Sequence, residues 1–292
     1  MLLRFRFPVS KGPSKMASVS TTTVPPTTAR TMYNKVPEAT IFFWIVKIMA
    51  TTVGETISDY FNSTLGWGLV GTFFLMASAL AVVMVVQFRA RRYIPAVYWL
   101  AVVLISVVGT LITDYLHDTR GYALAPLTII FSIALIACFG IWYASEKTLS
   151  IHSIYTTKRE AFYWTTILCS FALGTASGDW LSDGPIQKIW SGNSAFLKAA
   201  FLFASFIGLV YLAFKKFGLN SILAFWMAYI VTRPLGASLG DFLSVGKSED
   251  VDFGKGLNLG TTVTSLIFLA AIVSIVVYLT VTKADLEEIE GR

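Results

Sequence analysis

The sequence predicts an all-α membrane protein of eight transmembrane helices, arranged as four parallel two-helix repeats. Three observations support this fold class. The 292-residue chain is 55% hydrophobic and 14% charged, whereas a soluble domain carries about 25% charged residues. Eight apolar stretches each approach the ~20 residues that a helix needs to cross the hydrocarbon core. A tryptophan followed fifteen residues later by an aspartate occurs four times, which indicates an internal repeat.

Each apolar stretch predicts one helix, and each repeat contributes two. The predicted helices cover residues 38–61, 67–88, 95–117, 122–144, 160–182, 195–214, 219–245 and 259–281. The second helix of each repeat is plainer and more apolar than the first, so we expect it to face lipid. Because each repeat has an even number of spans, all four enter the membrane with the same polarity. We therefore expect a pseudo-fourfold axis along the membrane normal, with two pseudo-twofold pairs as the alternative.

The predicted domains are four repeats between two tails. The repeats cover residues 36–93, 94–156, 157–217 and 218–283, with tails at 1–35 and 284–292. The first tail is basic, rich in Ser, Thr and Pro, and expected to be disordered; Met16 and Met32 are alternative starts. It lacks the apolar run of a secretory signal. The last four residues, Ile-Glu-Gly-Arg, match a protease site added for expression, so part of the second tail is expected not to be native.

The distribution of positive charge predicts the orientation of the chain. Sixteen Lys and Arg residues lie in the tails and between repeats, against five in the loops within repeats. Positive residues remain on the cytoplasmic side, so we expect a multi-pass protein of the plasma (inner) membrane with both termini in the cytoplasm. The net charge of +6 is spread over short clusters between apolar runs. This pattern reflects topology and argues against nucleic-acid binding.

One face of each first helix carries the residues that we expect to function, and we call it the axial stripe. At 100° per residue, positions 4, 7, 11 and 15 after the tryptophan lie within about 60° of it. A glycine five residues before each aspartate is expected to allow close helix contact. The tryptophans are Trp44, Trp99, Trp164 and Trp226; the glycines are Gly54, Gly109, Gly174 and Gly236; the aspartates are Asp59, Asp114, Asp179 and Asp241.

Charged groups at mid-bilayer must face one another or water, because each costs ~2.5–3.5 kcal/mol there. We therefore expect the stripes to line a shared cavity in which the four aspartates form a cation site. Glu55, Thr110 and Thr175 form a second tier one turn earlier, and Lys47 and Arg233 tune or gate the site. The tryptophans are candidates for lining the cavity, although interfacial anchoring and packing explain most membrane tryptophans. Capping of helix ends is the alternative for the aspartates.

Four converging carboxylates with hydroxyl groups offer the oxygen ligands that hard cations take. A divalent metal ion bound at Asp59, Asp114, Asp179 and Asp241 is therefore the favoured substrate. Arg233 and Pro234 occur in the fourth repeat alone, and this asymmetry favours a site for a specific solute over a symmetric pore. Arg233 could neutralise Glu55 or Asp59, or could bind an anionic solute.

Several functions are disfavoured by missing motifs. The sequence has no Gly-x-x-x-x-Gly-Lys-Ser/Thr loop for ATP and no arrangement suited to hydrolysis, so we do not expect an enzyme. Cys138 and Cys169 lie in apolar segments without a Cys or His partner at metal-ligand spacing. We interpret both cysteines as packing residues.

The four tryptophan segments make the chain resemble a known group of bacterial proteins. These are often called uncharacterised membrane-anchored proteins and have four tandem repeats, each with two transmembrane segments and a tryptophan. The resemblance covers about residues 37–281 through the segments at Trp44, Trp99, Trp164 and Trp226. It implies the architecture and no particular activity.

The sequence thus predicts a secondary transporter of a small solute, with a cation favoured and proton coupling open. A passive cation channel and a non-transporting sensor or scaffold remain alternatives. The expected partners are the lipid bilayer and a small ionic solute, with no cofactor beyond a bound divalent metal. Pairing of two chains through their second helices stays open.

Overall fold

The computed structural model describes residues 34–181, 195–244 and 257–285. These residues form helices and their connections, with no strand among them. The tails predicted at 1–35 and 284–292 lie almost wholly outside the described residues. The long helices are α1 (Ile41–Asp59), α2 (Gly68–Arg89), α3 (Pro95–Asp114), α4 (Leu124–Glu146), α5 (Thr157–Leu181), α7 (Ala195–Phe217), α8 (Ser221–Ser244) and α9 (Gly260–Thr282).

Local sequence accounts for several helix ends. The Thr40 side chain accepts a hydrogen bond from the Phe43 amide, 3.4 Å away, and caps α1. Proline, whose fixed φ suits the first helical turn, opens α3. At their other ends, α1 and α3 pass directly into one-turn π-helices, η1 (Tyr60–Thr64) and η2 (Tyr115–Thr119). The wider π turn begins immediately after Asp59 and after Asp114. A short 3₁₀ helix, η3 (Ile151–Ser153), precedes α5.

The eight predicted helices are present within a few residues of their expected bounds. In the described part of the chain, seven of them are long and apolar enough to cross a membrane, all except α5. Helix α5 has 25 residues but begins with Lys158, Arg159 and Glu160 and contains many Ser and Thr residues. It contacts α3, α4 and α8. A helix surrounded by protein does not need the apolar surface that lipid requires.

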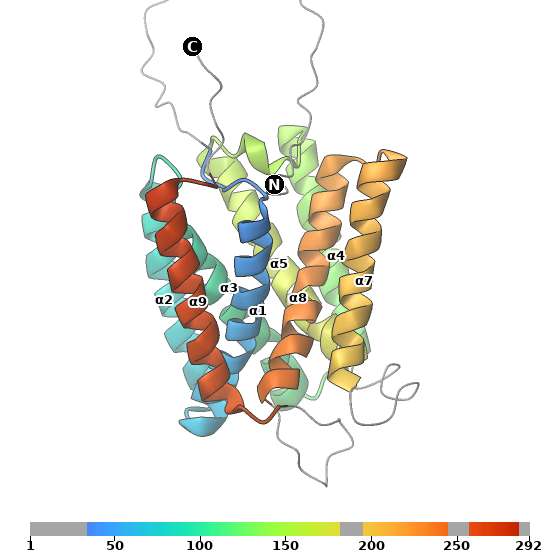
Figure 1. Cartoon of the computed structure of the whole chain (residues 1–292). Coiled ribbons are helices and arrows are strands. Elements are labelled where there is room, and N and C mark those ends of the chain that lie inside the picture. Colours follow the sequence, from blue (N-terminus) through green and yellow to red (C-terminus); the bar gives the residue numbers. More distant parts are fainter. Residues whose placement is uncertain (1–33, 182–194, 245–256, 286–292) are drawn as a thin grey trace, which may run out of the picture.

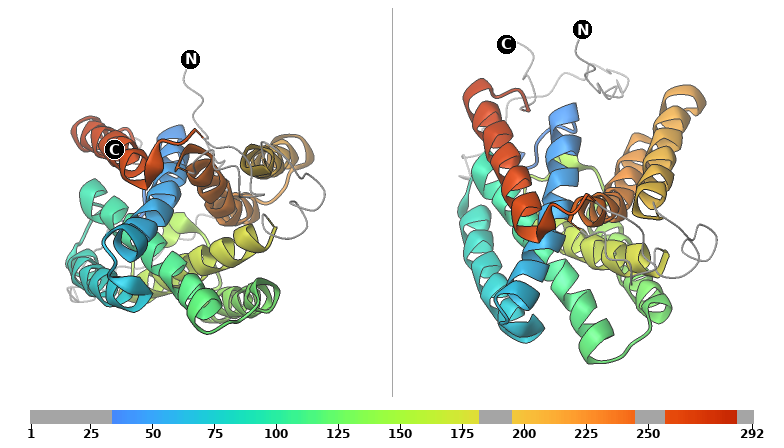
Figure 2. Two further views of the ribbon diagram at one scale, coloured as in Figure 1. Left: turned by 90° about the horizontal axis from the view of Figure 1, so that it is seen from below. Right: turned by 60° about the horizontal axis from the view of Figure 1, so that its bottom comes forward.

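Four helices form the inside of the bundle. α1 and α5 each contact α3 and α8, so these four helices make a closed ring. Each of the other helices packs on the outside, against the ring helix that follows it in the chain: α2 on α3, α4 on α5, and α7 on α8. The last helix, α9, packs against α1 and completes the outer layer (Figure 2).

Burial follows this division into inner and outer helices. Between 56% and 72% of the most apolar part of α1, α3 and α8 is buried, against 11–22% for α2, α4, α7 and α9. The exposed residues of the outer helices are mostly large and apolar, such as Phe74, Ile136 and Phe201. The second helices therefore have the surface expected of lipid-facing helices.

The two described chain ends meet at one end of the bundle (Figure 1). The backbone amide of Glu38 donates a hydrogen bond to the carbonyl oxygen of Asp285 at 3.0 Å. Helix α1 starts at this end and runs to the opposite end, where it finishes at Asp59. We call the two ends of the bundle the terminal end and the aspartate end.

Candidate functional site

The ring helices approach one another closely at the four stripe glycines. A Cβ atom added at any of these glycines would overlap a side chain seven residues after the tryptophan of a neighbouring ring helix. At Gly109, for example, the added atom would lie 2.8 Å from Phe171 Cβ, which is closer than two carbon atoms approach. The close helix contact predicted from small residues is therefore present. The four pairs are Gly54 with Ser106, Gly109 with Phe171, Gly174 with Arg233, and Gly236 with Thr51.

These contacts place the side chain of Arg233 inside the ring. Gly174 of α5 accommodates the Arg233 stem, and only 1% of the residue is exposed. The Nη2 atom donates to Glu55 Oε2 at 2.5 Å, to Thr175 Oγ1 at 2.8 Å, and to Thr110 Oγ1. One side chain of α8 thus binds α1, α3 and α5 together, through the second tier predicted from the sequence.

The remaining nitrogen atoms of Arg233 are not satisfied in the same way. Nε and Nη1 are buried and have no hydrogen-bond partner among the described residues. Buried polar groups nearly always have such a partner, so Nε and Nη1 are the unsatisfied part of this site. The hydroxyl groups of Ser106 and Tyr229 are also buried without a partner in the described structure.

The second buried cation, Lys47, lies among neutral groups. Its Nζ atom donates to the Tyr229 carbonyl at 3.1 Å and to Thr232 Oγ1 at 2.7 Å. The same atom lies 3.9 Å from the centroid of the Tyr229 ring and 4.8 Å from that of Phe171, close enough for cation–π attraction. Lys47 is 1% exposed and close enough to Arg233 for the two charges to interact.

The four stripe aspartates lie at or near the ends of the ring helices, where they are half-buried. Asp59, Asp114 and Asp179 each interact electrostatically with Glu55 and Arg233. Asp241 interacts with Asp179. The structure therefore gathers carboxylates near the aspartate end, in line with a cation-attracting entrance.

The predicted metal site is not formed in this arrangement. No group of three or more His, Cys, Asp or Glu side chains in the described chain is placed to hold one metal ion. The carboxylate bound nearest the centre, that of Glu55, is paired with Arg233. Joint metal binding by Asp59, Asp114, Asp179 and Asp241 therefore stays a prediction.

Toward the terminal end, aromatic side chains fill the ring. Trp99, Trp164 and Trp226 are buried in the main hydrophobic core, and the half-buried Trp44 packs against it. The residue before each tryptophan is also a buried aromatic, namely Phe43, Tyr98, Tyr163 and Phe225. The hydroxyl groups of Tyr98 and Tyr163 are 2.5 Å apart and share a hydrogen bond. In this structure the tryptophans pack in the core, and this aromatic layer closes the axis on that side.

A buried polar cluster at the terminal end was missed by the sequence analysis. Lys35 Nζ donates to Glu160 Oε2 at 2.6 Å, and Gln87 Nε2 donates to Glu160 Oε1 at 3.0 Å. All three residues are 1% exposed. Lys35 was assigned to the disordered tail, whereas it holds the start of the described chain against α2 and α5. The sequence offered one signal of this cluster, the single acid Glu160 at the start of an apolar span.

A second contact fixes the other chain end. Tyr93 Oη donates to Asp285 Oδ2 at 2.6 Å, and both residues are buried. Burial raises the pKa of Asp285, an effect that the hydrogen bond from Tyr93 partly opposes. Burial, together with the nearby Asp285 carboxylate, also raises the pKa of Tyr93.

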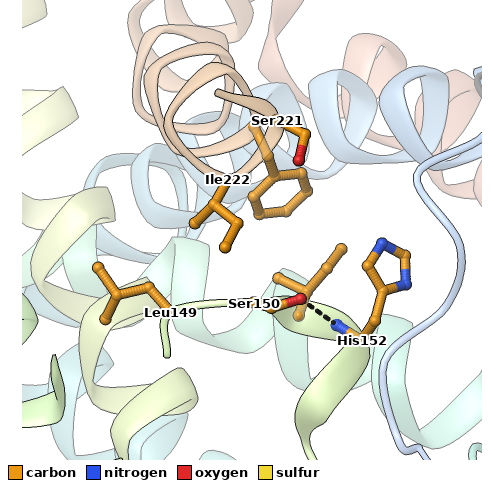
Figure 3. Close-up of a pocket in the computed structure, with 7 residues that line it drawn as sticks. Leu149, Ser150, His152, Ser221 and Ile222 are labelled. Atoms are coloured by element: carbon orange, nitrogen blue, oxygen red, sulfur yellow. Dashed lines mark hydrogen bonds between the residues drawn. The ribbon is translucent and has the colours of Figure 1, made fainter. Parts of the chain in front are cut away.

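A small pocket of about 40 Å³ opens at the terminal end. It lies between the segment around η3 and the start of α8 (Figure 3). Leu149, Ile222 and Phe225 supply apolar walls, and His152 stands at one side. His152 Nδ1 lies 2.9 Å from Glu38 Oε1. The pocket contains none of the axial-stripe residues, so we do not assign the solute site to it.

The two cysteines come from neighbouring helices. Cys138 Sγ on α4 and Cys169 Sγ on α5 are 3.7 Å apart as free thiols. The sequence analysis treated them as separate packing residues, because spacing along the chain cannot reveal that α4 lies against α5.

Comparison with known proteins identifies one family. A family described as "Repeat of Unknown Function (DUF347)" matches residues 42–93, 97–148 and 224–285. The three matched segments correspond to α1 with α2, α3 with α4, and α8 with α9, and together they cover more than half of the chain. Neither the curated proteins nor the solved structures contain a match.

Proposed function

We propose that this chain, which belongs to the DUF347 repeat family, is a secondary transporter that moves a small ionic solute along the axis of its helix ring. A cation drawn to Asp59, Asp114, Asp179 and Asp241 is the transported or coupled ion, and protons are the simplest coupling ion. The observation that carries this proposal is the buried guanidinium of Arg233, held between Glu55, Thr110 and Thr175.

The architecture proposed for this transporter is four equivalent two-helix repeats about a pseudo-fourfold axis. The segment 157–217 would be the third repeat, although the family matches do not include it. Support comes from the four glycine contacts, which pair the same two repeat positions on each neighbouring pair of ring helices. Both termini would lie in the cytoplasm, and the plasma membrane is the proposed location.

The ion pair explains how such a pathway could be opened and closed. Arg233 of α8 pairs with Glu55 of the neighbouring helix α1 and also bonds Thr110 of the opposite helix α3. Separating a buried pair while leaving one charge unmatched costs about 3–5 kcal/mol, so the pair holds the ring closed. A proton on Glu55, or a cation arriving from the aspartates, would offset that cost and release the guanidinium. The aromatic layer would then be the second gate.

The structure does not support the earlier preference for a divalent metal, because the carboxylates are not grouped as metal ligands. A passive channel is less favoured, because the ion pair and the aromatic layer interrupt the axis. A scaffold without transport would use Arg233 as a structural tie alone, and this is the alternative that an experiment must separate.

The test is ion flux in proteoliposomes containing the purified full chain. Uptake of monovalent cations and of protons would be compared for the wild type, Asp59→Asn, Asp179→Asn and Glu55→Gln. We expect at least about a tenfold loss of coupled flux in each variant, as for removal of one charged contact from a site. Glu38→Gln is the control, because Glu38 is a partly exposed acid at the terminal end, away from the four aspartates.

Transport would show saturation and dependence on the proton gradient, whereas a channel would show neither. If the three variants are folded and none changes any flux, the stripe is a structural network and the transport proposal fails.

A further inference from the structure

Arg233 has more hydrogen-bond donors than the neighbouring residues of the ring have acceptors to bind them. A guanidinium group carries five N–H bonds. Three acceptors surround the two N–H bonds of Nη2, while the three N–H bonds on Nε and Nη1 have no partner among the described residues. Only 1% of Arg233 is exposed, so bulk water does not supply the missing hydrogen-bond partners.

The missing partner must offer acceptor oxygen atoms. Leaving charged donors unsatisfied costs more than the ~1–3 kcal/mol of a neutral group, so Nε and Nη1 call for an acceptor that the described residues do not supply. Ser106, at the same stripe position of α3, and Tyr229, one turn before Arg233 on α8, add two buried hydroxyl groups without partners in the described structure.

The balance of charge in the middle of the ring favours an anion. Lys47 and Arg233 are both 1% exposed, and the contacts found for Lys47 are to a carbonyl, a hydroxyl and two aromatic rings. Glu55 is the carboxylate that bonds to Arg233. Two buried cations therefore share one hydrogen-bonded carboxylate, while Asp59, Asp114 and Asp179 interact with Arg233 from the aspartate end. On the side of Arg233 that faces Lys47, an acceptor with a negative charge would meet two cations, where the cost of unmatched charge is high.

We propose that Nε and Nη1 of Arg233 bind the carboxylate group of a small solute, with Lys47 as the second cation. This inference rests on the proposed transport function and names its solute class. The stripe has acids toward the aspartate end and bases deeper in the ring. A free monocarboxylate would use the bases alone, whereas an amino acid would also place its ammonium group toward the aspartates.

The experiment measures binding in the purified full chain, in lipid nanodiscs at neutral pH. A ligand that binds the folded state alone raises the unfolding temperature in proportion to its occupancy. Sodium acetate and glycine are the two probes, and sodium chloride at equal ionic strength is the reference. Acetate tests the carboxylate alone, and glycine tests the carboxylate with an ammonium group.

The variants are expected to change acetate binding in opposite directions. Lys47→Met and Arg233→Gln should each weaken acetate binding about tenfold, as for loss of one charge-assisted contact. Glu55→Gln should strengthen it, because the competing carboxylate is neutralised. Arg120→Gln is the charge-matched control, since Arg120 is exposed beyond α3, and it should bind like the wild type. If Arg233→Gln does not fold, Lys47→Met and Glu55→Gln still decide the question.

Equal stabilisation by acetate, glycine and chloride in the wild type would overturn the proposal. Water would then be the partner of Nε and Nη1. The same responses in Lys47→Met and Arg120→Gln would overturn it as well. Binding with the expected variant pattern but without flux would uphold this site and reject transport. Coupled flux without binding of either probe would reject the carboxylate site alone.

Discussion

At the scale of single residues, the missing side chain of Gly174 determines where Arg233 can lie. The Arg233 stem occupies the position that a Cβ atom at residue 174 would need. The guanidinium can therefore reach Glu55, Thr110 and Thr175 from α8. A residue with any side chain at this position would push Arg233 out of the shared site.

We expect Gly174→Ala to destabilise the protein by about 1–3 kcal/mol, as overpacking does in well-packed interiors. Thermal unfolding in detergent measures this change. Gly208→Ala on α7 is the control, because no atom lies within 4 Å of a Cβ atom added there, and it should be neutral or slightly stabilising. Equal effects of the two substitutions would show that the ring tolerates displacement of Arg233.

At the scale of helices and segments, the packing of α4 against α5 can be tested with the native cysteines. Cys138 and Cys169 are on α4 and α5, with sulfur atoms 3.7 Å apart. A disulfide has an S–S distance of about 2.05 Å, so a small movement suffices. We expect a membrane-permeable oxidant to form an intramolecular disulfide, detected by intact mass spectrometry before and after reduction. Cys138→Ser should abolish it, and only intermolecular products in the wild type would contradict the contact.

The segment after α9 should respond to pH through Asp285. Its pKa is raised above 3.8 by burial, so the folded state holds this proton more tightly than the unfolded state. The stabilising contribution is complete below pH 3.8 and is lost as pH rises through the folded-state pKa. We expect the unfolding temperature of the wild type to fall more steeply with rising pH than that of Asp285→Asn.

Asp285→Asn is itself the comparison for this pH series, because it removes the titrating carboxyl group and leaves the backbone hydrogen bond from Glu38 to Asp285 in place. Identical slopes in the wild type and Asp285→Asn would show that burial of the Asp285 carboxyl group does not contribute to the pH dependence.

At the scale of the whole molecule, the closed ring brings the described chain ends together. Glu38 and Asp285 share a backbone hydrogen bond, and the connection at residues 218–220 is largely exposed. We expect a circular permutant that joins residues 285 and 34 by a short flexible linker and opens at Leu219 to fold. Its unfolding temperature should lie within about 5 °C of the wild type. Deletion of 218–285 should prevent stable folding, because it removes α8 from the ring.

The sequence was sufficient to predict the helices because a bilayer sets their length and apolar content. The stripe was predicted because helical periodicity places Glu55, Thr110 and Thr175 on equivalent faces. The sequence could not show which helices lie side by side. The position of Arg233 along the chain does not reveal that its stem packs at Gly174. The metal site stays a prediction for the same reason, since carboxylates at equal spacing on four helices need not meet at one point.

The wrapping of each outer helix onto the next ring helix has a consequence for synthesis. The chain emerges from the ribosome in order, and α1 is inserted first, while its outer neighbour α9 comes last. Until then the lipid, or an insertion factor, must cover the side of α1 that α9 will occupy. A chain truncated before α9 therefore keeps that side of α1 in contact with lipid or with the insertion factor.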